Sequence, residues 1–99
     1  MANSKRRYIM NIARRKNIAL VIAEIESLSE KMETVLADIG IIKDEEEEYR
    51  DNIPENLQGS ERYSSAEEAV NNLDSAYETL QEAFDNLGDV ISSLEEASV

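Results

Sequence analysis

The chain of 99 residues contains neither cysteine nor histidine. Without cysteine it forms no disulfide and offers no thiolate to a metal or a substrate, and without histidine it lacks the commonest general base. Its three glycines, Gly40, Gly59 and Gly88, stand apart, so no glycine-rich loop is present to hold a phosphate group. These absences predict that the protein is not an enzyme and that it holds no metal or cofactor.

Long apolar runs are also missing. The apolar run at residues 18–23 meets Glu24, so it is too short for a membrane span or for the apolar core of a secretory signal. The lack of cysteine also fits a reducing compartment. We therefore expect a cytoplasmic protein that does not enter a membrane.

Residues that break helices are scarce and are concentrated in one place. The only proline, Pro54, and Gly59 both lie in the polar stretch DNIPENLQGS at residues 51–60. The long runs on either side are rich in alanine, leucine, isoleucine and glutamate, which is typical of helices. We predict one domain over residues 1–99, with helix one at about 4–50, a turn at 51–60 and helix two at about 61–97.

Apolar residues of helix one recur every seven residues in three neighbouring columns, lettered by heptad position. The a column is Ile18, Ile25, Met32, Ile39 and Glu46, and the d column is Val21, Leu28, Val35, Ile42 and Tyr49. Ile22 and Leu36 form an e column that widens the apolar stripe. We expect the a and d columns to face helix two.

Helix two has an equally regular pattern. Its a column is Tyr63, Val70, Tyr77, Phe84 and Ile91, and its d column is Ala66, Leu73, Leu80, Leu87 and Leu94. A flanking column of small residues, here named the alanine column, is Ala69, Ala76, Ala83, Val90 and Ala97. Small residues let another helix approach closely, so this column is a candidate contact for a further helix.

The two patterns predict an all-α fold, an antiparallel two-helix coiled-coil hairpin. If paired residue numbers sum to 112, each a residue meets a d residue of the other helix, for example Val35 with Tyr77. A lone hairpin leaves the e column and the alanine column uncovered. We therefore expect a homodimer that forms a four-helix bundle, with a monomer as the alternative.

The turn itself contains apolar residues and helix signals. Ile53 and Leu57 are predicted to close the end of the core, and residues 54–58 to form one helical turn. Two residues compete to cap helix two. Ser60 is one, and Ser64 is the other, with Glu67 three residues later completing a capping box.

Charge is distributed unevenly along the chain, whose net charge is −12. All acidic residues follow position 22, and six of the ten basic residues form an N-terminal arm: Lys5, Arg6, Arg7, Arg14, Arg15 and Lys16. The arm could bind nucleic acid, although the acidic remainder of the chain opposes that. The alternative is that Arg15 and Lys16 neutralise Glu95 and Glu96 at the end of helix two.

The acidic residues favour a protein partner over a metal. Consecutive carboxylates at residues 44–48 diverge on a helix, whereas hard cations need oxygen ligands that converge. A rigid rod with rows of carboxylates instead resembles the charge density of nucleic acid and fits the basic groove of a nucleic-acid-handling protein. Solubilising charge is the alternative. The candidate protein-binding residues are Asp44, Glu45, Glu47, Glu48, Glu67, Glu68, Glu78 and Glu82.

The turn and its flanks carry a recognisable pattern, an acidic helix end followed by a polar turn and alanine-rich heptads. The turn residues of the pattern are Asn52, Ile53, Pro54, Glu55, Leu57, Gln58 and residues 60–62. This C-terminal half resembles a group of uncharacterised short helical proteins from Firmicutes, their bacteriophages and mobile elements. The resemblance implies a phage or mobile-element origin, and it implies no active residues.

Charge and resemblance together predict a non-catalytic protein that binds a basic, nucleic-acid-handling bacterial protein through its acidic surface. Inhibition of a host defence protein is one specific form of this hypothesis. The alternatives are a nucleic-acid-binding protein that uses the basic arm, and a structural coiled coil whose function is its own assembly.

Overall fold

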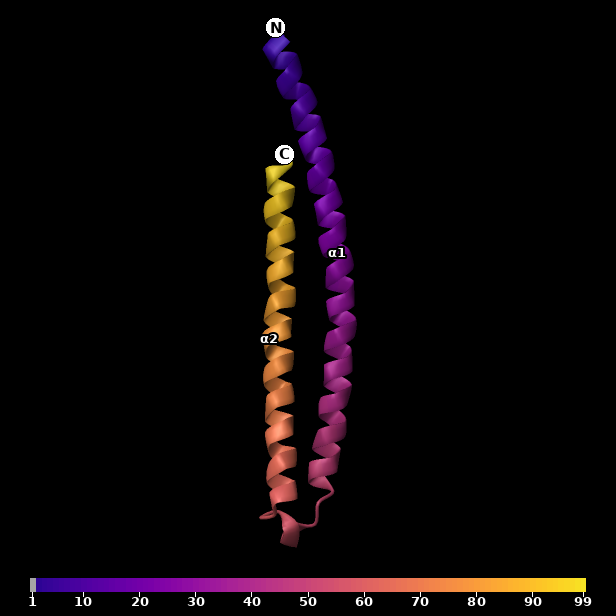
Figure 1. Cartoon of the computed structure of the whole chain (residues 1–99), viewed down its shortest axis with the longest axis vertical. Coiled ribbons are helices and arrows are strands. Elements are labelled where there is room, and N and C mark those ends of the chain that lie inside the picture. Colours follow the sequence, from indigo (N-terminus) through magenta and orange to yellow (C-terminus); the bar gives the residue numbers. More distant parts are fainter. Residues whose placement is uncertain (1) are drawn as a thin grey trace.

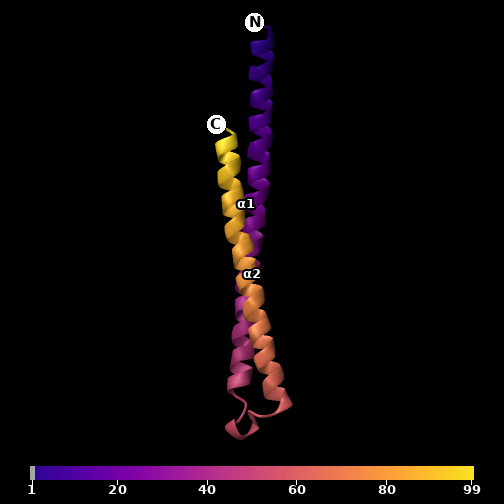
Figure 2. The ribbon, with the colours of Figure 1, turned by 90° about the vertical axis from the view of Figure 1, so that its left-hand side faces the viewer.

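The computed structural model describes the backbone of residues 2–99 and the side chains of residues 11–99. The elements follow in the order α1 (Ala2–Asp51), η1 (Glu55–Leu57) and α2 (Glu61–Ala97). The two long helices lie side by side and antiparallel, joined by the short segment that contains η1 (Figures 1 and 2). No strand occurs in the described backbone. The predicted all-α helical hairpin is therefore confirmed.

The hairpin is a slender rod of 84 × 16 × 15 Å. Helix α1 has 50 residues and α2 has 37, so at 1.5 Å per residue they are about 75 and 55 Å long. The N-terminal end of α1 consequently projects beyond the end of α2 (Figure 1). Helix α1 runs through Gly40 without a break, starting two residues before and ending one residue after the expected range of 4–50.

The connection between the helices is tightly hydrogen-bonded. The Ile53 N–H donates to the Arg50 carbonyl at 3.1 Å, and the Leu57 N–H donates to the Pro54 carbonyl at 2.8 Å. The second bond closes η1, as expected for residues 54–58. Ile53 is only 2% exposed and closes the core as predicted, whereas Leu57 is 46% exposed. The prediction for Leu57 is wrong because it lies at the end of η1, where its side chain remains in solvent.

Helix α2 is capped by Ser60 and not by Ser64. The Ser60 Oγ accepts a hydrogen bond from the Tyr63 N–H at 3.3 Å, and Ser60 has the extended backbone typical of an N-cap. Ser64 lies inside the first turns, where its N–H donates to the Ser60 carbonyl at 3.1 Å. The alternative cap at Ser64 is therefore wrong. Once Ser60 has started the helix, residues 61–63 contain no breaker that would stop it.

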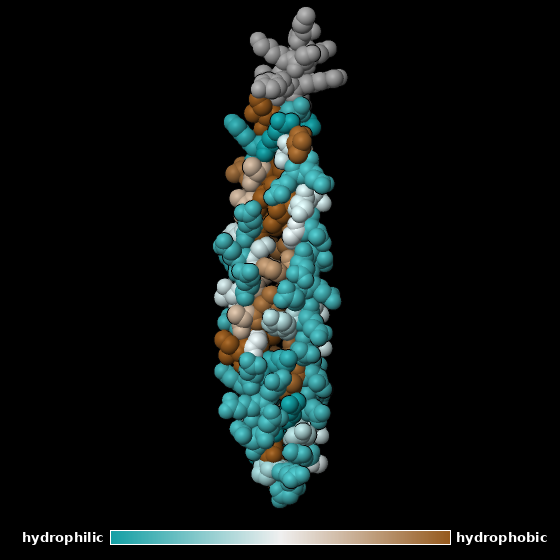
Figure 3. Space-filling view, turned by 180° about the vertical axis from the view of Figure 1, so that it is seen from behind, coloured by the Kyte–Doolittle hydropathy of each residue, from teal (hydrophilic) through white to brown (hydrophobic). Residues whose placement is uncertain are grey.

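The core of the hairpin is narrow and open to solvent. Its buried side chains are Leu36, Ile53, Ala66 and Val70, with exposures of 2–5%. Other residues between the helices are half-buried. Figure 3 shows apolar side chains at the surface along the line where the helices meet, with hydrophilic side chains on both sides. Two helices alone therefore shield their apolar residues only in part.

Helix α1 turns a different pair of columns inward than the sequence suggests. All members of the a and d columns of α2 are buried or half-buried, as predicted. On α1, the a column is half-buried but the d column is exposed, and Ile22 and Leu36 of the e column lie inside. The prediction that the d column faces α2 is wrong. A junction of two helices covers about two columns of each helix, and α1 carries three.

The pairing of the helices is shifted with respect to the predicted one. Lys43 Nζ lies 2.8 Å from Asp74 Oδ1, and a Cβ at Gly40 would lie 3.9 Å from Tyr77 Cε2. Both pairs of residue numbers sum to 117, so in the middle of the hairpin Tyr77 lies beside Gly40, five residues beyond the predicted Val35. Near the loop, Arg62 lies over Tyr49, a pair whose sum of 111 is close to the predicted 112. Exchanging the d column for the e column rotates α1 about its axis, and this rotation moves the matching layers along the helix.

Candidate functional site

An ion pair between the helices marks one broad face of the hairpin. The Lys43 Nζ of α1 donates a hydrogen bond to the Asp74 Oδ1 of α2 at 2.8 Å and lies 3.8 Å from the Glu47 Oε1. The hydrogen bond to Asp74 raises the pKa of Lys43, and the nearby carboxylates of Glu47 and Asp44 act in the same direction. Asp74 is 47% exposed, so solvent screens this ion pair and its main effect is to place these residues on the same face.

Acidic residues gather on this face in regular columns. All ten acidic residues of α2 fall in three neighbouring heptad columns, one of which contains Asp74. Between positions 26 and 47, two columns of α1 on the same side, which include Glu47 and Asp44, contribute five more acidic residues. The residues that we name the acidic face are Glu26, Glu30, Glu33, Asp44, Glu47, Glu67, Asp74, Glu78, Asp85 and Glu95.

The structure brings half of the eight predicted protein-binding residues together. Asp44, Glu47, Glu67 and Glu78 belong to the acidic face. By heptad position, Glu48, Glu68 and Glu82 lie on the outer edges of the helices. Glu45 lies on the side of α1 opposite to the acidic face.

Sequence reasoning missed several members of the acidic face, among them Asp74 and Asp85. The signal that identifies them is the seven-residue spacing of the acidic residues in α2, which links Glu67 to Asp74 and Glu78 to Asp85. A seven-residue spacing places charged residues on one side of a helix just as it does apolar ones.

A second face is marked by a cation–π contact. The Arg62 guanidinium lies 5.4 Å from the centre of the Tyr49 ring. Tyr49 ends the d column of α1, and Arg62 stands one heptad before Ala69, the first residue of the alanine column of α2. The contact therefore places these two columns on the same side of the hairpin. We name them together the apolar face.

The bulky half of the apolar face is exposed along the whole hairpin. The exposed fractions are 43% for Val21, 49% for Leu28, 46% for Val35, 50% for Ile42 and 47% for Tyr49. Neither of its two columns contains an acidic residue, and the next column outward on α2 is Ser65, Asn72, Thr79, Asn86 and Ser93. The hairpin therefore has two opposite faces of different chemistry, one acidic and one apolar.

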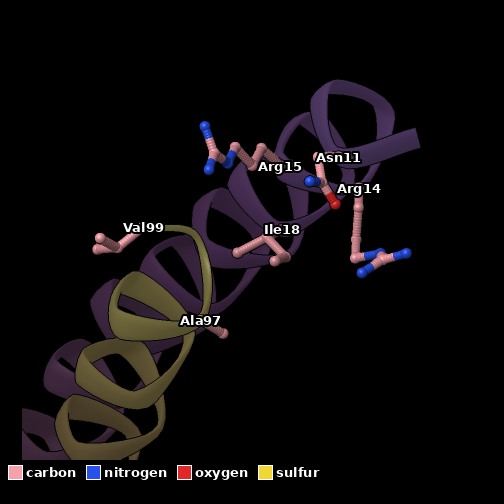
Figure 4. A pocket seen from close by; sticks show the side chains of 6 residues that line it. All are labelled: Asn11, Arg14, Arg15, Ile18, Ala97 and Val99. Atoms are coloured by element: carbon pink, nitrogen blue, oxygen red, sulfur yellow. The ribbon is translucent and has the colours of Figure 1, made fainter. Parts of the chain in front are cut away.

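The basic arm lies at the end where α1 projects past α2. Arg14 and Arg15 line a notch of about 230 Å³ together with Asn11, Ile18, Ala97 and Val99. In Figure 4 the two arginine side chains point away from each other, so they do not converge on one ligand position. The side chains of Lys5, Arg6 and Arg7 lie outside the described residues, and Lys16 is exposed.

The predicted neutralisation of the basic arm would bring Arg15 and Lys16 into contact with Glu95 and Glu96. Among the side chains that the structure describes, no ion pair joins these residues. The arginines do lie beside the carboxyl end of α2, where the helix dipole favours positive charge.

Among the described residues, no three acidic side chains come close enough to hold a metal ion. Neither helix, over the same residues, has an apolar stretch long enough to cross a membrane. No protein-family model matches the chain, and comparisons with curated proteins and with solved structures found no match either.

Proposed function

We propose that the chain is a non-catalytic, protein-binding hairpin that engages a basic, nucleic-acid-handling protein through its acidic face. The observation that supports this most directly is the confinement of all ten acidic residues of α2 to three neighbouring columns, two of which belong to the acidic face. Carboxylates in one column recur about every 10 Å along a helix. Such rows create a negative field along one side of a rigid rod and attract a positively charged partner.

The partner is defined by the chemistry that would recognise this face. A groove lined with lysine and arginine, which normally holds a phosphate backbone, matches a straight acidic rod in charge and in shape. With the resemblance to phage and mobile-element proteins, the proposal places the hairpin in the bacterial cytoplasm. Inhibition of a defence protein is its most specific form, and the acting species is a homodimer.

Matched charge reversals test the proposal. The double variant Glu67→Lys with Glu78→Lys alters the acidic face, whereas Glu24→Lys with Glu45→Lys makes the same change of net charge in a column beside the apolar face. Each variant is used to capture protein from a nuclease-treated Firmicutes lysate. We expect only the first variant to lose the basic partner bound by the wild type. Equal loss by both would mean that net charge, not the acidic face, determines binding.

Nucleic-acid binding by residues 5–16 is a second candidate, favoured by the exposure of Arg14 and Arg15 on the projecting end of α1. It is tested by fluorescence anisotropy with a labelled 30-base-pair duplex at increasing salt. Binding that falls steeply with salt and disappears in the double variant Arg14→Ala, Arg15→Ala would support the arm and contradict the acidic-face proposal.

A further inference from the structure

The apolar face is large enough to be a protein interface. Its bulky column runs from Val21 to Tyr49, which is about 40 Å along the helix. Because the hairpin is 16 Å wide, a partner on this face would bury an area on the order of 700 Å² per copy. The total of about 1,400 Å² for two copies is within the range of stable protein interfaces. In contrast, one copy alone buries only four apolar side chains among its described residues.

The two columns of the apolar face complement each other. One is bulky and the other is small, and both repeat every seven residues. Their members form five pairs whose residue numbers each sum to 118, close to the sum of 117 shown by the contacts in the middle of the hairpin, Lys43 with Asp74 and Gly40 with Tyr77. The pairs are Val21 with Ala97, Leu28 with Val90, Val35 with Ala83, Ile42 with Ala76, and Tyr49 with Ala69. In the middle of the hairpin, bulky residues of α1 therefore lie close to level with small residues of α2.

This arrangement is self-complementary under one particular symmetry. A two-fold axis parallel to the rod and lying in the interface places α1 of one copy over α2 of the other, in antiparallel orientation. Bulky side chains of each copy then meet small side chains of the other in all five layers. The contact is the same for both copies, as a closed two-fold dimer requires.

We propose that a second copy of this chain covers the apolar face and forms a symmetric four-helix bundle with both loops at the same end. The inference deepens the proposed function, on which it rests for the role of the acidic faces. The apolar columns carry no acidic residue, and the acidic residues nearest to them on α1, Glu24, Asp38 and Glu45, lie at the edge of the contact and not in its centre. The two acidic faces point outward on opposite sides of the dimer.

The mass in solution and one pair of matched substitutions test the interface. Multi-angle light scattering should give a dimer of twice 11.2 kDa. Ala83→Glu places a carboxylate in the apolar face of each copy, and Ala37→Glu makes the same change at an exposed helix position on the acidic side. We expect the dissociation constant to rise roughly 100-fold or more for Ala83→Glu and to stay within about threefold of wild type for Ala37→Glu.

Three results would overturn the inference. They are a monomeric wild type at 100 µM, a species larger than a dimer, and dissociation by Ala37→Glu as strong as by Ala83→Glu. Ala83 is exposed in the single hairpin, so far-ultraviolet circular dichroism should show that both variants keep their helices. The Glu67→Lys, Glu78→Lys variant should remain dimeric, which separates failure of the dimer from failure of partner binding.

Disulfide formation tests the symmetry directly, because the protein has no cysteine of its own. Val35→Cys and Ala83→Cys are prepared separately, mixed and oxidised. The proposed bundle predicts a cross-link between the two variants in the mixture and little cross-link in either variant alone. Efficient cross-linking of Val35→Cys with itself would place like columns over each other and contradict the proposed axis.

Discussion

Replacing a glycine inside α2 should stabilise the hairpin. Gly88 lies within the helix, its φ angle is not positive, and a Cβ built on it meets nothing within 4 Å. Alanine at this position therefore causes no steric strain. It gains the full difference in helix propensity between the two residues, about 1 kcal/mol, partly because the unfolded chain loses conformational freedom.

The expected size of the effect can be worked out further. In a domain of about 100 residues, 1 kcal/mol raises the melting temperature by roughly 4–8 °C. At Gly40, the added Cβ would lie 3.9 Å from Tyr77 Cε2, which is ordinary van der Waals contact, so Gly40→Ala should gain a similar amount. The two sites are far apart along the rod, and the double variant should gain about 2 kcal/mol.

Thermal unfolding followed by circular dichroism measures these effects at one fixed protein concentration. Gly88 shares a column with Asp74, so its replacement does not touch the apolar face. The reverse change at an exposed helix position, Ala37→Gly, should cost about 1 kcal/mol and serves as the control. A melting temperature that is unchanged or lower in Gly88→Ala would refute the reasoning, because it would show that α2 is not an uninterrupted, unstrained helix there.

Three further predictions concern the loop and the contacts beside it. Ile53→Ala should cost about 2–5 kcal/mol in chemical denaturation, whereas Leu57→Ala, half exposed, should cost less than half as much. Ser60→Ala should cost about 1 kcal/mol by loss of the cap, and Ser64→Ala much less. The pKa of Lys43 is raised on folding, so its stabilising contribution is fully present below its ordinary pKa of 10.5 and is lost as the pH rises through the raised pKa of the folded state. The difference in melting temperature between wild type and Lys43→Met should therefore disappear in strongly alkaline solution.

Much of the fold follows from local sequence patterns. Pro54 and the polar residues around it separate two regular heptad runs, and helix boundaries near residues 51 and 61 follow from them. The inner columns of α2 are also evident, because that helix has only one continuous stripe of large apolar residues. Local patterns suffice where one face of a helix is clearly the most apolar.

The inward face of α1 could not be predicted in the same way. Its d column is entirely apolar, whereas the e column includes Lys43 and Arg50, so hydrophobicity alone favours the d column. The structure places the e column inside, where Leu36 is buried and Lys43 reaches Asp74. This choice depends on contacts between residues far apart in sequence. The exposed d column is the reason why the apolar face exists.

The acidic candidates illustrate the same limit. A run of consecutive carboxylates at residues 44–48 attracts attention in the sequence, but a helix distributes its members around the axis. Asp44 and Glu47 lie on one side and Glu45 on the other. Residues seven apart, such as Glu67 and Asp74, share a surface instead.

The position of the buried residues has a consequence for the order of folding. Three of the four, Ile53, Ala66 and Val70, lie next to the loop. Contacts between the two helices near this loop close short segments of chain, which takes about 10–100 ns. Contacts farther from the loop close longer segments. We expect the hairpin to begin folding at the loop and to extend toward its free end. Substitutions near Ile53 should then slow folding, whereas substitutions near Leu94 should mainly speed unfolding.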